Sequence, residues 1–108
     1  MSTPLPPGLT AYRRTPEFDQ DTVPAGLLRG HSTKAGVWAL IHVLEGRLAY
    51  RILEPEETVV LEPGHPPGVV VPQQLHEVAP LGPVRFFVEF HALRPVEGAV
   101  HERGGLPP

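Results

Sequence analysis

The 108-residue chain contains no cysteine, which excludes a disulfide framework, a thiolate metal site and a cysteine nucleophile. Basic residues are not in excess either. The net charge is −3, so the positive surface on which nucleic-acid binding depends is missing. No apolar run reaches the length of a membrane span, and the opening MSTPLPPGLT lacks the basic start and apolar centre of a signal peptide. We therefore expect a cytoplasmic protein that binds neither nucleic acid nor membranes.

Long helical patterns are also missing, because proline and glycine interrupt the chain throughout. The sequence has 15 prolines and 11 glycines, and both residue types end helices and mark turns. Hydrophobic residues make up 41% of the chain, which is enough for one compact core. Turn signals recur roughly every eight to twelve residues, a spacing typical of β-sandwiches and small barrels. We predict a single all-β domain of the jelly-roll type with about seven or eight strands.

The apolar segments place the expected barrel at residues 10–93, between a flexible proline-rich arm at 1–9 and a flexible Pro/Gly-rich tail at 94–108. Two β-rich runs, VWALIHVLE and RLAYRIL, flank Gly46, and this pattern predicts a hairpin turn at the glycine. A second turn is expected at 81–83, ahead of a separate aromatic strand, VRFFVEFHAL.

The segment TAYRRTPEF at 10–18, with Tyr12 and Phe18 as its apolar anchors, is predicted to be an edge strand, because Pro16 cannot donate a ladder hydrogen bond. Exposed strand edges are usually paired or protected. We therefore expect a homodimer that forms through this segment. Trp38, the only tryptophan, is expected to pack in the core.

Six histidines are the candidate chemical groups, because imidazole is the commonest metal ligand and the usual general base. His65 lies in the turn PGHPPG and His101 in the tail, so both are expected to be surface residues. Apolar neighbours surround His42, which predicts a half-buried structural role. His31 stands just before the longest apolar strand, and His76 follows a proline-led turn at the entry to another strand. For these last two, a structural role and a functional role are about equally open.

Two blocks of the sequence carry a family resemblance, namely HSTKAGVWALIHVLEGRLAY at 31–50 and VVVPQQLHEVAPLGPVRFFVEF at 69–90. Together with the lead-in TPEFDQDTVPAGLLRGH, they resemble the TehB/YeaR-like family. This is a small cupin-type domain found at the N-terminus of some tellurite-resistance proteins and also as a free-standing protein. The resemblance covers about residues 10–92 and implies the cupin fold, a double-stranded β-helix.

The resemblance also implies a place for a metal site. In cupins generally, a first motif supplies two histidines and one glutamate, and a second motif supplies one more histidine. Here the second-motif histidine corresponds to His76. In the first motif the glutamate position falls on Ala39, and the only histidine near the expected pair is His31. The usual four-ligand site therefore does not form unchanged.

Two imidazoles and one carboxylate suffice for a divalent metal with open positions. We expect His31 and His76 to hold such an ion, Zn²⁺ or Fe²⁺, with Glu89 as the third ligand. A buried Glu89 needs a cation or a metal as partner, and Lys34 is the organic cation that we expect in the same pocket. The alternative is a polar cluster of these residues without a metal.

The resemblance implies a binding or sensing module for a metal ion or small ligand, linked to tellurite, oxyanion or nitrosative stress. One alternative is a metal-dependent enzyme of the oxygenase or isomerase type that acts on a small organic substrate. Another is a structural domain that contacts a partner through its proline-rich ends. The phosphate-binding loop, nucleophile elbow and zinc-protease motifs are absent. Tellurite-resistance members carry a methyltransferase domain after this part, and we expect none in a chain that ends at Pro108.

Overall fold

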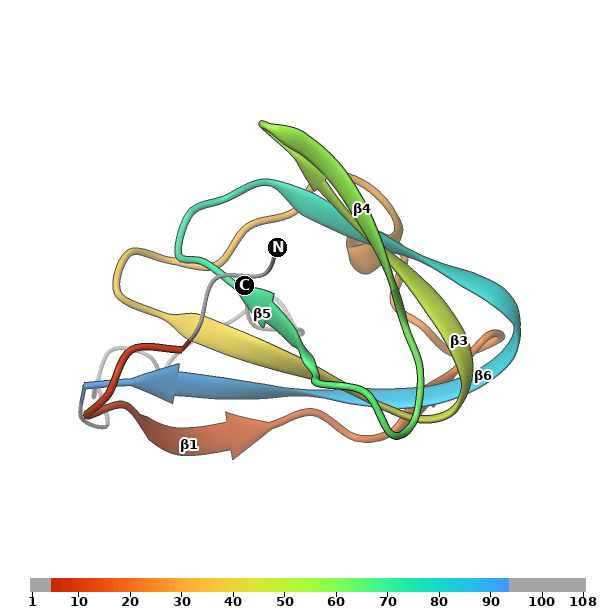
Figure 1. Ribbon diagram of the computed structural model, residues 1–108, viewed down its shortest axis with the longest axis horizontal. Coiled ribbons are helices and arrows are strands. Elements are labelled where there is room, and N and C mark those ends of the chain that lie inside the picture. Colours follow the sequence, from red (N-terminus) through yellow and green to blue (C-terminus); the bar gives the residue numbers. More distant parts are fainter. Residues whose placement is uncertain (1–4, 94–108) are drawn as a thin grey trace.

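The computed structural model describes residues 5–93, and within this range the chain is all-β (Figure 1). The one helix among these residues is a short 3-10 helix, η1 (Ala25–Leu28). It is not long and apolar enough to cross a membrane. The strands are β1 (Thr10–Arg14), β2 (Phe18–Asp19), β3 (Trp38–Leu53), β4 (Glu56–Leu61), β5 (Gly68–Val70) and β6 (His76–Ala92).

The two long strands, β3 and β6, form the centre of a single six-stranded sheet. They pair antiparallel along almost their whole length, from Trp38 opposite His91 to Ile52 opposite His76. Strands β1 and β2 pair with β6, while β4 and β5 pair with β3. In the order β1-β6-β3-β4, strand β1 lies at one edge, in agreement with the edge strand predicted there.

The hairpin predicted at Gly46 is wrong, because β3 runs through this glycine as one strand. Its pairing with β6 shifts register between Val43 and Glu45 and again between Gly46 and Leu48. Such bulges bend a strand and disrupt its ladder only locally, so that pairing resumes on both sides. The turn predicted at 81–83 is likewise part of the continuous β6. Two predicted pairs of strands are therefore two long bent strands, so residues 5–93 form six strands instead of the seven or eight predicted.

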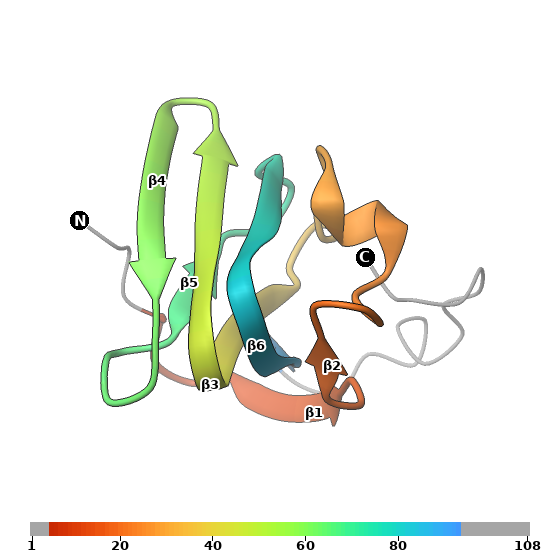
Figure 2. The ribbon, with the colours of Figure 1, turned by 90° about the vertical axis from the view of Figure 1, so that its right-hand side faces the viewer.

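Both long strands bend near the same place, so the sheet curls back on itself, as Figures 1 and 2 show. The side chains on its concave face form the core, and buried and outward side chains alternate along the strands: Ala39 and Ile41 are buried, whereas Trp38 is only half-buried. The expectation that Trp38 packs in the core is therefore wrong. The core cluster consists of Phe18, Leu27, Val37, Ala39, Ile41, Leu48, Tyr50, Leu61, Val70, Val78, Val84, Phe86, Val88 and Phe90.

The predicted arm and tail lie largely beyond the residues that the structure describes. Residues 5–9 belong to no strand or helix. Residues 1–4 and all of 94–108, including His101, are outside the described range.

Candidate functional site

Two loops that lie far apart in the sequence pair with each other and bring two histidines together. The amide of His31 donates to the carbonyl of His76 over 2.9 Å, and the amide of His76 donates back to His31 over 2.8 Å. A third bond, from the amide of Gln73 to the carbonyl of Thr33 at 3.0 Å, extends this pairing. The segment before β3 is thus tied to the segment that opens β6. His31 and His76, both selected from the sequence, are neighbours as a result.

The orientation of His76 is fixed by the turn that precedes it. Pro72 and Gln73 occupy this turn, with Gln73 at a positive φ of 63°. The carbonyl of Gln74 lies 3.0 Å from Nδ1 of His76. Because a carbonyl can only accept, Nδ1 must carry the hydrogen, and in the neutral ring Nε2 keeps its lone pair. Metal-bound histidines are commonly held by such a bond to a backbone carbonyl.

Burial keeps the His76 ring uncharged. The residue is only 5% exposed. Burial is the largest influence on the pKa of His76 and lowers it, and the nearby His31 lowers it further. The hydrogen bond to the carbonyl of Gln74 raises the pKa but does not cancel the effect of burial. Desolvation disfavours the imidazolium form. At neutral pH, His76 therefore presents a lone pair and no positive charge.

The aromatic rings around His76 complete this end of the site. The ring of His31 meets it edge-on, with centroids 5.4 Å apart and an interplanar angle of 81°. On another side, the ring of Tyr50 lies 5.8 Å away at 77°. The hydroxyl of Tyr50 donates to the carbonyl of Val69 over 2.9 Å, and burial, followed by the charge of Glu57, raises the pKa of Tyr50. The phenol therefore stays protonated and joins β3 to β5.

Sequence reasoning missed Tyr50. A signal was present, since Leu48, Tyr50 and Ile52 alternate along one face of the strand. Whether this face points toward His76 depends on the register of β3 against β6, and that register places Ile52 opposite His76.

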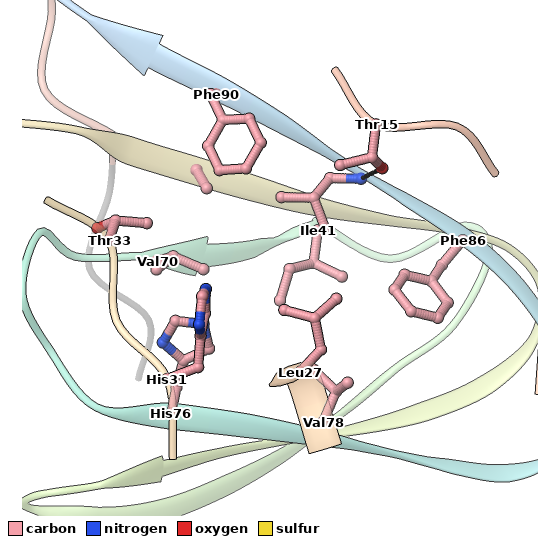
Figure 3. A pocket seen from close by; sticks show the side chains of 12 residues that line it. Thr15, Leu27, His31, Thr33, Ile41, Val70, His76, Val78, Phe86 and Phe90 are labelled. Carbon is pink, nitrogen blue, oxygen red and sulfur yellow. Dashed lines mark hydrogen bonds between the residues drawn. The ribbon is translucent and has the colours of Figure 1, made fainter. Parts of the chain in front are cut away.

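The two histidines lie at one end of a cavity inside the curled sheet (Figure 3). Thr33 adds a hydroxyl there, but that hydroxyl donates to the carbonyl of Val37 over 2.7 Å. Leu27, Ile41 and the phenyl rings of β6 line the rest. The space inside it that a water-sized atom can reach is about 20 Å³, which is enough for about one water molecule or one metal ion. The lining residues are Thr15, Leu27, His31, Thr33, Ala39, Ile41, Val70, His76, Val78, Phe86, Val88 and Phe90.

Glu89 does not join this pair, which corrects the expectation that it points into the barrel. Along β6 the inward side chains are Phe86, Val88 and Phe90, so Glu89 lies on the opposite face. Its Oε1 lies 2.9 Å from Nε2 of His91 and 3.4 Å from Nε2 of His42. Burial raises its pKa, but the bonds from the two rings outweigh this and keep the pKa of Glu89 below its usual value.

The other candidates are also placed apart from the cavity. Lys34 is exposed and is not among the cavity's lining residues, so the expected pairing of Lys34 with Glu89 in one pocket is not formed. His65 is exposed, as predicted, and its Nδ1 lies 3.7 Å from Oε2 of Glu62. His42 is half-buried, as predicted, and stacks on Phe87 with centroids 4.8 Å apart.

The donor set in the cavity limits the chemistry that it can perform. Within residues 5–93, no group of three or more His, Cys, Asp or Glu side chains is arranged to hold a metal ion. The cavity lining contains no lysine, arginine or carboxylate among the described residues. Two imidazoles can accept hydrogen bonds or supply two metal ligands, and any further ligand must come from water or a bound molecule. A free oxyanion would find no fixed positive charge there at neutral pH.

Comparison with known proteins places the chain in one family. A model of the TehB-like domain matches residues 13–88. The crystal structure of TehB from Haemophilus influenzae is similar with a TM-score of 0.72 and 27% identity, covering 78% of this chain and 31% of that one. A crystal structure of a protein from E. coli (strain K12) is similar with a TM-score of 0.77 and 22% identity, covering 86% of this chain and 99% of that one. No curated protein sequence matches. The chain spans about a third of TehB, and the E. coli likeness shows the fold alone.

Proposed function

Because the chain belongs to the TehB-like domain family, we propose that it is a small cupin-type binding module that holds a divalent metal ion, and through it a small ligand, in the curled sheet. The paired histidines carry this proposal. His31 and His76 lie side by side at a cavity whose remaining walls are mostly apolar. The resemblance of this family to tellurite-resistance proteins supports a role in the response to tellurite or related oxyanion stress.

The two histidines fit a metal with open coordination positions. Nδ1 of His76 is bound to the carbonyl of Gln74, which leaves Nε2 to donate a lone pair, and burial keeps that ring neutral. His31 supplies the second imidazole. A bound Zn²⁺ or Fe²⁺ would act as a Lewis acid toward a ligand in the positions that the protein leaves open. An oxyanion would then be held by the metal, since the cavity itself offers no cation.

Metal content tests this proposal directly. Protein stripped with a chelator and then titrated with Zn²⁺, or with Fe²⁺ without oxygen, is expected to retain about one equivalent after dialysis. The measurement is elemental analysis, with heteronuclear NMR of the imidazole nitrogens to show which rings respond. If the reloaded protein keeps no metal, or if the His31 and His76 resonances do not move, the proposal fails.

A homodimer formed through the edge strand is a second expectation. Strand β1 lies at the edge of the sheet, and open edges favour pairing with a second chain. At tens of micromolar, light scattering is expected to give twice the chain mass of 11.8 kDa, falling toward the chain mass on dilution. A single mass of one chain across the dilution series would rule out the dimer.

A further inference from the structure

One leucine limits the space in the histidine cavity. Only about 20 Å³ inside the cavity is open to a water-sized atom, so that it holds a single ion or water molecule. Leu27 lines the cavity and is 7% exposed, whereas the other three residues of η1 are exposed. Its side chain enters between the two histidines and Phe86 (Figure 3). A ligand larger than water therefore needs the space that Leu27 fills.

The segment 24–30, which carries this leucine, is anchored at both of its ends. Before it, the carboxylate of Asp19 accepts hydrogen bonds from the amides of Asp21 and Thr22 over 2.8 and 2.9 Å. These bonds close a tight turn. After the segment, two backbone hydrogen bonds tie His31 to the start of β6. The segment thus runs between two fixed points on the surface of the sheet.

Between these anchors the segment is held to the sheet by packing. The amide of Leu27 donates to the carbonyl of Pro24 over 2.9 Å, which is a bond within the segment. The start of η1 has no side-chain cap. In the part of the chain that the structure describes, no hydrogen bond or ion pair joins the segment to a strand. Since η1 packs against β6 (Figure 2), the buried side chain of Leu27 is the main contact that keeps the segment in place.

We propose that the segment 24–30 is a lid, and that Leu27 sets the size of the ligand that reaches the two histidines. With the lid closed, the site takes a metal ion or a water molecule. A larger ligand, such as an oxyanion bound to that metal, reaches the site only when the lid lifts and withdraws Leu27. Opening exposes little more than one leucine, so it costs far less than unfolding of the whole domain. The role in ligand entry rests on the proposed function, whereas the lid itself requires no metal.

The reactivity of His76 in the metal-free full chain measures how often the lid opens. Diethyl pyrocarbonate modifies the unprotonated nitrogen of an imidazole and is too large for the closed cavity, and peptide mass mapping gives the rate at each histidine. The exposed His65 reports the reactivity of an open ring. His91 is the buried control, because it is 9% exposed, its Nδ1 has no hydrogen-bond partner among the described residues, and it lies outside the cavity. His91 is expected to react only when the whole domain unfolds.

Two adjacent residues of η1 supply matched variants with opposite expected effects. Leu27→Ala removes the side chain that holds the lid and is expected to raise the rate at His76 about tenfold, with the rate at His91 unchanged. Gly26→Ala leaves the cavity as it is, because a Cβ at Gly26 would meet nothing within 4 Å. Alanine has fewer conformations than glycine in the open segment, which favours the closed lid. The rate at His76 is therefore expected to fall about threefold in Gly26→Ala.

Three results would overturn the lid. They are a wild-type His76 that reacts as fast as His65, a Gly26→Ala protein in which the rate at His76 does not fall, and a Leu27→Ala protein in which His91 gains as much as His76. The last result would mean that the whole domain opens. Should Leu27→Ala fail to fold by circular dichroism, the result with Gly26→Ala still decides. Because these rates need no metal, a protein that shows them and yet retains no zinc keeps the lid and contradicts the metal proposal alone.

Discussion

Replacing Gly46 with alanine is expected to destabilise the folded chain by about 3 kcal/mol or more, a large part of the stability of a small domain. Gly46 has a φ of 77°, a conformation that L side chains rarely adopt. A Cβ at this position would lie 2.0 Å from the carbonyl oxygen of Pro83 and 2.9 Å from Cα of Val84. These are backbone atoms of the partner strand, so the clash is not relieved by a side-chain rotation. The alanine therefore forces β3 and β6 apart at their common bend.

A substitution at a second glycine, Gly64, distinguishes the cost of the steric clash from the cost of placing alanine at a positive φ angle. Gly64 has a φ of 85°, and a Cβ there would meet nothing within 4 Å. Gly64→Ala is therefore expected to cost about 1 kcal/mol, the strain of the backbone conformation alone. Urea unfolding followed by circular dichroism gives both values. If Gly46→Ala proved no less stable than Gly64→Ala, the close approach of the two strands at the bend would be wrong.

The same bend explains what the sequence could and could not predict about the fold. The β-rich run around Ala39 and Ile41 correctly predicts a strand, since the period of two is a local property, but the expectation that Trp38 packs in the core chose the wrong face. A glycine between two apolar runs fits both a hairpin turn and a bulged, continuous strand. The choice is made by the partner strand, which bends at Gly82 and Pro83 beside Gly46. That information is not local to either run.

In the candidate site, too, some features follow from the local sequence and others depend on distant parts of the chain. The family resemblance singles out His31 and His76, and the structure brings them together through the pairing of the two loops. Glu89 required a decision on which face of its strand turns inward. The three apolar neighbours Phe86, Val88 and Phe90 occupy the inward face, because burying phenyl rings is far more favourable than burying a carboxylate. Glu89 is therefore left on the outer face, with His42 and His91 as partners.

Trp38 and Tyr50 show that the size of an aromatic residue alone does not place it. Trp38 alternates with the buried Ala39 and so lies on the outer, half-buried face. Tyr50 is buried and reaches both His76 and the backbone of β5. Its hydroxyl needs a partner when buried, and the carbonyl of Val69 supplies one. Whether an aromatic side chain is buried is better predicted by whether it shares a face of the strand with residues that are buried.

Replacing His76 with alanine is expected to abolish stoichiometric metal binding. The variant removes the imidazole whose Nδ1 is held by Gln74 and whose Nε2 carries the lone pair, and one remaining histidine binds a divalent ion only weakly. The fold is expected to survive with a loss of about 2 kcal/mol, since the core of Phe86, Phe90 and their neighbours is untouched. Elemental analysis after dialysis measures the metal, and circular dichroism measures the fold.

Two further substitutions separate this site from the other histidines and carboxylates. His65→Ala removes an exposed ring outside the cavity and is expected to leave the metal content unchanged. Glu89→Gln is the sharper comparison, because Glu89 lies on the outer face of β6 and pairs with His91. It is expected to keep the full equivalent of metal. Loss of metal in Glu89→Gln with retention in folded His76→Ala would move the site to the outer cluster and contradict the assignment to the cavity.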